Sequence, residues 1–304
     1  MNRKQFLLSS GLLLTVGFSS SMIRFNPRKM DRIGLGTVIF RDRFIQTKPK
    51  TITPVNGPLT LLEIPTYYKD RFGINQIEFW SEHFESLQPN YLNQLKAQIK
   101  KQGSTLINVQ VDVDYDLAST DETRRKSSLS LVKNWVDAAA FLGSRAVRVN
   151  PGRANGHIDQ SIKSMQEISA YARSKKLILL SENHFGIEMD PDKHIEILKK
   201  SGPNHYTLPD FGNYPVEGMY ESLAKIIPYA YMISAKIKDV DSTFQSLSYD
   251  YKRCIELAES LGFKGIYCLE QWSPNEQLID FEKLTDTLIA DSLQAIYPSS
   301  PHRR

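Results

Sequence analysis

Apolar runs of strand length alternate with segments of helical spacing along most of the chain. Short runs such as residues 74–80 are rich in apolar and aromatic side chains, which is typical of buried strands. Longer segments such as residues 122–142 repeat apolar side chains every three or four positions and stop at a glycine, which is typical of amphipathic helices. The pattern predicts strands at residues 33–40, 74–80, 105–113, 146–150, 177–181, 206–208, 231–237 and 265–269.

Helical spacing fills the intervals between these strands. The predicted helices cover residues 61–72, 90–102, 122–142, 158–174, 192–200, 216–227, 249–261 and 281–296. Eight alternations of strand and helix indicate the α/β class and match a single-domain (β/α)8 TIM barrel over residues 30–297. A doubly wound open sheet is the alternative, but no glycine-rich phosphate loop follows the first strand.

The first 21 residues have the pattern of a secretory signal. Arg3 and Lys4 precede an apolar stretch at residues 6–18, and serines follow at 19–21. The apolar stretch is too short to span a bilayer stably. The run from Arg3 to Leu7 also resembles a twin-arginine export signal with lysine in place of the second arginine. A buried N-terminal helix is the alternative. We expect export to the bacterial periplasm, without stable membrane insertion once the leader is cleaved.

Composition narrows the class of partner. The chain has 304 residues, 41% hydrophobic and 24% charged, which is ordinary for a globular protein. The net charge of +4 is weak, and no basic stripe interleaved with aromatic residues suggests a nucleic-acid partner. The two cysteines, Cys254 and Cys268, have a spacing that requires no disulfide, so we expect buried free thiols.

Three predicted strands are followed within two residues by a carboxylate: Glu182, Asp210 and Glu270. In a barrel the C-terminal strand ends converge on one pocket, so these groups are expected to meet. Carboxylates brought together repel one another, and a proton or a cation must stabilise them. Oxygen ligands with one imidazole, such as His184, suit Mn²⁺ or Mg²⁺, and such an ion polarises a carbonyl group.

Other polar and aromatic side chains at the strand ends are candidates for binding a substrate. Alternation along a strand places Glu182 and His184 on one face, and Arg148 and Asn150 on one face. Trp80 and Trp272 could each stack on a sugar ring, although packing in the core is an equal alternative. The substrate-binding candidates are Glu78, Arg148, Asn150, Asn213 and Trp272. Asp112 and Asp114 fit a solvated loop without a role.

Six short motifs together resemble the xylose isomerase-like barrels, a family of sugar phosphate isomerases and epimerases. That family shares its fold with endonuclease IV and the ketose 3-epimerases. The resemblance runs from about residue 33 to residue 292. The motifs are IEFW at 77–80, VRVN at 147–150, SENH at 181–184, PDFGN at 209–213, SAK at 234–236 and LE at 269–270.

The resemblance implies one divalent metal, Mn²⁺ or Mg²⁺, held by Glu, Asp, His and Glu at the ends of strands five to eight. Matched to this chain, those positions are Glu182, Asp210, Ser234 and Glu270. The serine is a departure, because the family pattern usually reads His-Ala-Lys there. Lys236 could occupy the histidine position in a register shifted by two, or could itself supply the positive charge. Two hypotheses remain: the site holds a metal through Glu182, Asp210 and Glu270, or it works without a metal.

The resemblance also implies an activity. In related epimerases two strand-end glutamates form the acid/base pair, which would be Glu182 and Glu270 here, with His184, Lys236 and Arg148 orienting substrate oxygens. We expect a sugar isomerase or epimerase that abstracts a proton next to a carbonyl of a small carbohydrate. A keto-sugar lyase or hydratase and a non-catalytic carbohydrate-binding barrel are the alternatives. Endonuclease activity is disfavoured, because that site needs more histidines than the six present could supply. The oligomeric state stays open.

Overall fold

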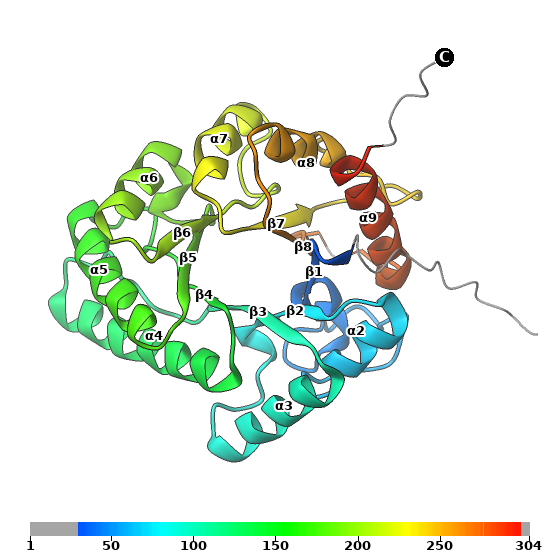
Figure 1. The fold of residues 1–304 in the computed structure, drawn as a ribbon, viewed down its shortest axis with the longest axis horizontal. Coiled ribbons are helices and arrows are strands. Elements are labelled where there is room, and N and C mark those ends of the chain that lie inside the picture. Colours follow the sequence, from blue (N-terminus) through cyan, green and yellow to red (C-terminus); the bar gives the residue numbers. More distant parts are fainter. Residues whose placement is uncertain (1–29, 276, 299–304) are drawn as a thin grey trace, which may run out of the picture.

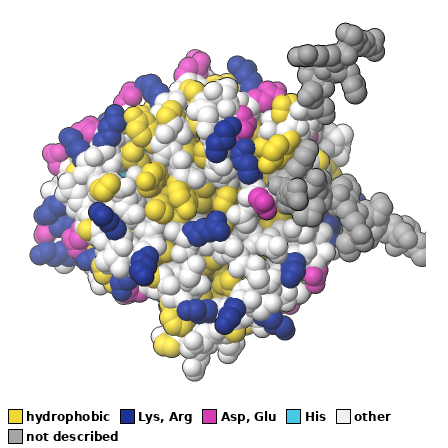
Figure 2. All heavy atoms as spheres, in the orientation of Figure 1, with side chains coloured by type: hydrophobic (Ala, Val, Ile, Leu, Met, Phe, Trp, Pro, Cys, Tyr) yellow, Lys and Arg dark blue, Asp and Glu magenta, His cyan; other side chains and the backbone are white. Residues whose placement is uncertain are grey.

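The computed structural model describes residues 30–275 and 277–298. The predicted leader at residues 1–21 lies outside the described residues, so export stays a prediction. Within the described ranges, none of the helices is both long enough and apolar enough to cross a membrane. On the face drawn in Figure 2, basic and acidic side chains are interspersed.

Parallel strands form the ring at the centre of Figure 1, which confirms the predicted (β/α)8 barrel. The hydrogen-bonded order is β6-β5-β4-β3-β2-β1-β8-β7. Isolated parallel bridges complete the ring between β6 and β7, pairing Thr207 with Ala230 and Asp210 with Ser234. The strands are β1 (Ile33–Gly36), β2 (Gln76–Trp80), β3 (Thr105–Gln110), β4 (Ala146–Arg148), β5 (Ile178–Glu182), β6 (His205–Leu208), β7 (Met232–Ile237) and β8 (Ile266–Gln271).

Helices cover the outside of the ring (Figure 1). Aspartate side chains cap the N-termini of four of them, and left-handed glycines end three. The helices are α2 (Ile64–Phe72), α3 (Pro89–Gln102), α4 (Glu122–Leu142), α5 (Ile158–Ser174), α6 (Pro191–Lys200), α7 (Met219–Ile226), α8 (Tyr251–Ser260) and α9 (Phe281–Ile296). The short 3-10 segments are η1 (Thr37–Arg43), η2 (Ser81–His83), η3 (Ile187–Met189) and η4 (Ile227–Tyr229).

The first strand is shorter than predicted. It ends at Gly36, and the apolar residues 37–40 belong to η1. A short apolar run does not distinguish a strand from a buried helical turn, and here the turn is stabilised by packing. The Phe40 ring lies against Tyr68 and Phe72 of α2, and the Tyr68 hydroxyl donates to the Gly36 carbonyl at 3.1 Å. As a result η1 leaves the ring at the C-terminal end of β1.

An apolar layer lies directly beneath the polar strand ends. It consists of Ile107, Ala146, Leu180, Leu208, Met232 and Cys268, all buried. Most of these residues stand two positions before a polar group of the site, and alternation therefore points both side chains to the same face. The layer excludes water from below and supports the polar groups above it. Cys254 and Cys268 are both buried and free, as expected.

Candidate functional site

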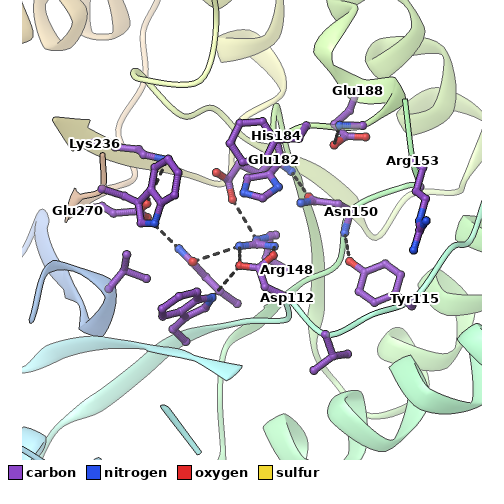
Figure 3. A pocket seen from close by; sticks show the side chains of 18 residues that line it. Asp112, Tyr115, Arg148, Asn150, Arg153, Glu182, His184, Glu188, Lys236 and Glu270 are labelled. Carbon is purple, nitrogen blue, oxygen red and sulfur yellow. Dashed lines mark hydrogen bonds and ion pairs between the residues drawn. The ribbon is translucent and has the colours of Figure 1, made fainter. Parts of the chain in front are cut away.

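A pocket of about 350 Å³ opens at the C-terminal ends of the strands (Figure 3). Its wall includes most of the predicted site residues: Arg148, Asn150, Glu182, His184, Lys236, Glu270 and Trp272. Three others, Glu78, Asp210 and Asn213, are buried but do not line the pocket. The barrel therefore brings the predicted residues together in two layers, one that faces the pocket and one that supports it.

Lys236 is the positive centre on one side of the pocket. Its ammonium lies 3.4 Å from Glu270 and 3.5 Å from Asp210, and it donates a hydrogen bond to Asn213 at 2.9 Å. The β7–β8 register sets Lys236 directly opposite Glu270. The side chain is only 3% exposed, and the neighbouring carboxylates hold its pKa above the usual range despite burial. Lys236 therefore stays charged at neutral pH.

Arg148 is a second buried cation. Its Nη2 donates to Asp112 at 2.8 Å, its Nη1 also contacts that carboxylate, and its Nε lies 3.0 Å from Glu182 (Figure 3). The guanidinium holds the pKa of Asp112 well below its usual range in spite of burial. Asp112 is thus not the solvated loop residue that the sequence suggested: it lines the pocket and orients Arg148. Asp114, in contrast, is exposed.

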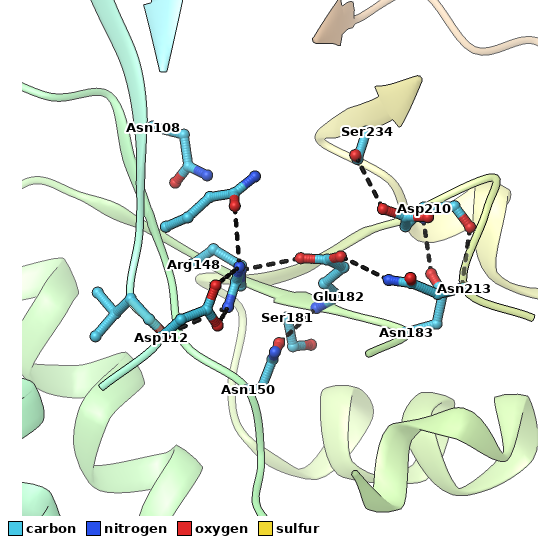
Figure 4. Close-up of polar contacts among 12 residues, drawn as sticks. Asn108, Asp112, Arg148, Asn150, Ser181, Glu182, Asn183, Asp210, Asn213 and Ser234 are labelled. Atoms are coloured by element: carbon cyan, nitrogen blue, oxygen red, sulfur yellow. Dashed lines mark hydrogen bonds and ion pairs between the residues drawn. The ribbon is translucent and has the colours of Figure 1, made fainter. Parts of the chain in front are cut away.

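Asn213 and Ser234 connect the carboxylates (Figure 4). The Asn213 amide donates to Glu182 at 2.8 Å and accepts from Lys236, so it links the Glu182 carboxyl to the Lys236 ammonium. The Ser234 hydroxyl lies 3.1 Å from Asp210 and 3.2 Å from Glu270. Burial raises the pKa of both Glu182 and Asp210, although the nearby cations oppose the rise. The cluster therefore retains protons toward neutral pH.

Glu78 lies behind the pocket wall. It accepts hydrogen bonds from Asn108 and Gln110, each at 2.7 Å, and Gln110 also contacts Glu270 at 3.1 Å. Burial raises the pKa of Glu78 to about 7. Because its oxygens are engaged by two amides, Glu78 supports the wall through Gln110. Asn213 likewise acts behind the wall, through Glu182. Direct substrate binding by either residue stays a prediction.

A family model for the xylose isomerase-like TIM barrels matches residues 70–296. This chain belongs to that family. Similar solved barrels include a Mycobacterium smegmatis xylose isomerase-like protein in complex with magnesium, a D-tagatose 3-epimerase-like protein and an Escherichia coli 3-keto-D-glucoside 4-epimerase. A search of curated proteins finds no match.

The structural similarity extends over nearly the whole barrel. The M. smegmatis protein is 17% identical with a TM-score of 0.61, and the alignment covers 90% of this chain and 100% of that one. The D-tagatose 3-epimerase-like protein is 15% identical with a TM-score of 0.63, and the alignment covers 87% of this chain and 98% of that one. The keto-glucoside epimerase is 15% identical with a TM-score of 0.60, and the alignment covers 85% of this chain and 99% of that one. At these identities the similarity shows the fold.

The residues of this xylose isomerase-like barrel do not fit the divalent metal that the family resemblance implies. In the described part of the chain, no group of three or more His, Cys, Asp or Glu side chains is arranged to hold a metal ion. Lys236 contacts Asp210 and Glu270, Arg148 contacts Glu182, and a hydroxyl stands at position 234. The predicted ligands Glu182, Asp210 and Glu270 thus already contact cations that belong to the chain.

Sequence reasoning missed Glu188 of η3. This pocket-lining carboxyl is 1% exposed, one oxygen accepts from the Gly186 amide at 3.0 Å, and the other has no hydrogen-bond partner among the described residues. Burial raises its pKa to about 7. Glu188 lies in a loop beyond the strand end, where periodicity gives no signal.

Half-buried His184 precedes this loop. Burial lowers the pKa of His184 to about 4, so its imidazole is neutral.

Proposed function

We propose that this chain is a sugar isomerase or epimerase that removes a proton from the carbon next to a carbonyl group of a small carbohydrate. The main support is that two buried carboxyls, Glu182 and Glu270, line one pocket and that a buried cation lies beside each. The epimerases among the similar structures support the proposal.

Removing the proton breaks a C–H bond and moves negative charge onto the carbonyl oxygen. The Lys236 ammonium is a fixed positive charge that can stabilise this oxygen in a site shielded from water. One glutamate takes the proton, and the other returns a proton to the opposite face or to the neighbouring carbon. Because burial raises the pKa of Glu182, this carboxyl retains a proton toward neutral pH, which suits the donor. Glu270 is then the acceptor.

The remaining wall supplies binding groups. The neutral imidazole of His184 can exchange hydrogen bonds with sugar hydroxyls, and Arg148 and Asn150 offer polar atoms beside it, from the end of the neighbouring strand β4 (Figure 3). The Trp272 ring can cover the apolar face of the sugar. The centroid of the Trp272 ring lies 5.5 Å from the Lys236 ammonium, so a sugar stacked on the indole would lie close to this cation.

Proton exchange tests this proposal. D-Fructose, D-tagatose and L-ribulose are incubated with the protein in D₂O containing a chelator, and NMR follows deuterium at the carbon next to the carbonyl. We expect exchange by the wild type and a loss of about 100-fold or more in Glu182→Gln and Glu270→Gln. The exposed Glu217→Gln is the matched control. Binding of the sugars without exchange would identify a carbohydrate-binding barrel, and an unsaturated product would identify a lyase.

We also propose that residues 1–21 export the chain to the periplasm. The proposal is supported by the basic, apolar and small-residue segments of the leader. Fractionation of the source bacterium followed by N-terminal sequencing tests it. A cytoplasmic protein that retains its leader would refute it.

A further inference from the structure

A second cavity, of about 190 Å³, lies at the same end of the barrel. Arg41 and Asp42 of η1 contribute one wall, and Phe281, the first residue of α9, contributes another. Trp272, which follows β8, lines this cavity and also the reaction pocket. The two cavities therefore share the indole as a common wall.

Asp42 presents an unused acceptor in this second cavity. Its side chain is 5% exposed, and its Oδ1 has no hydrogen-bond partner among the described residues. Buried polar atoms in folded proteins almost always have a partner, so a buried oxygen in a cavity wall indicates that a ligand or water supplies the donor. The cavity therefore combines apolar walls with a buried polar acceptor that is free to bind a ligand.

Arg41 is held in place beside this carboxylate. Its Nη1 donates to the Gln271 carbonyl at 3.0 Å and to the Gln271 side-chain oxygen at 2.6 Å. Its guanidinium carbon lies 5.9 Å from the centre of the Phe281 ring. Gln271 directly follows Glu270 on β8, so the same strand positions both cavities.

The chemistry of these walls favours a neutral, hydroxylated ring. Trp272 and Phe281 can cover the apolar face of such a ring, while Asp42 accepts from its hydroxyls and Arg41 donates to its oxygens. A phosphate would bring negative charge to the open Asp42 oxygen, which like-charge repulsion disfavours. The pair of one carboxylate and one guanidinium is balanced for an uncharged ligand.

We propose that the second cavity binds the second sugar ring of a neutral glycoside whose keto-bearing ring occupies the reaction pocket, with Trp272 lining both cavities. This inference rests on the proposed function and names its substrate class. It predicts that glycosylated ketoses are better substrates than free or phosphorylated ketoses, because only a second ring reaches Asp42.

The test compares exchange kinetics in D₂O for D-fructose, fructose 6-phosphate and the glucosyl- or galactosyl-fructoses turanose, isomaltulose and lactulose. We expect kcat/KM at least about tenfold higher for one of the disaccharides than for D-fructose, as one charged hydrogen bond provides, and no gain from the phosphate. Asp42→Asn and the cavity-filling Ile52→Trp are each expected to lower the disaccharide-to-fructose ratio of kcat/KM about tenfold. The exposed Asp31→Asn is the matched control.

The outcomes separate this inference from the proposed function. Exchange with D-fructose but without preference for any disaccharide overturns the second sugar site alone, and so does a preference that survives Ile52→Trp. Preference for the phosphorylated ketose also overturns it. Absence of exchange with every ketose overturns the proposed function, and the inference falls with it. The filled-cavity variant keeps the test decisive where Asp42→Asn fails to fold.

Discussion

Replacing Lys236 with methionine removes the cation from the carboxylate cluster while keeping a long, unbranched side chain. The ammonium lies 3.4 Å from Glu270 and 3.5 Å from Asp210. At an effective dielectric constant of about 20, each contact corresponds to about 5 kcal/mol of Coulomb energy before desolvation. Removing one partner of a buried ion pair costs about 3–5 kcal/mol. We expect Lys236→Met to lower the free energy of unfolding by about that amount near pH 8.

The loss is expected to shrink in acid. Burial raises the pKa of Asp210 in the folded state above its unfolded value, so this group favours folding below its unfolded pKa and loses that contribution as pH rises. In the wild type the Lys236 ammonium opposes the rise in pKa. Without it the pKa of Asp210 rises further, and the stability of the variant falls more steeply between about pH 5 and 8.

Urea unfolding followed by circular dichroism at pH 5.5 and pH 8 measures both effects. Lys238→Met is the matched control, because Lys238 is half-buried and lies two residues beyond the cluster. An equal loss of stability in the two variants, or a loss for Lys236→Met that does not change with pH, would refute the assignment of Lys236 as the counter-ion of the carboxylates.

Three further results are expected. Lys236→His replaces the cation with a metal ligand beside two carboxylates, so this variant is expected to retain more Mn²⁺ than the wild type in metal analysis. A Cβ at Gly186 would lie 2.0 Å from the Gly152 carbonyl oxygen, so Gly186→Ala is expected to displace the Glu188 loop and slow proton exchange. Burial lowers the pKa of His194 and His205, which stabilise the fold above pH 6.5 and lose that contribution in acid, so replacing both with glutamine is expected to flatten the fall in stability between pH 6.5 and 4.5.

The sequence predicted the order and type of the elements because both are local properties. Apolar spacing distinguished strands from helices along the chain, and glycines marked the ends of some helices. The strand predicted at 105–113 ends earlier, at Gln110, and the larger exception is residues 37–40. Their apolar run was compatible with a strand, and only packing against α2 made it part of η1. That one change places Arg41 and Asp42 beside Trp272, which no periodicity in the sequence indicated.

The predicted pocket residues followed from the same local rule. Side chains alternate along a strand, and parallel strands end on the same side of a barrel, so Glu182 and Glu270 had to point into one region. Glu188 and Asp112 were missed because they stand beyond the strand ends, where the path of the loop decides the direction of a side chain.

The sequence by itself determined a (β/α)8 barrel with carboxylates and basic groups gathered at one end, since periodicity and strand direction fix both. Only the tertiary structure decided how the charges pair. Sequence left Ser234 and Lys236 as rivals for one position, and the barrel shows both on the inner face, with the longer lysine reaching Asp210, Glu270 and Asn213. Charge pairing depends on distances of a few ångströms between strands far apart in the chain, and those distances exist only once the ring closes.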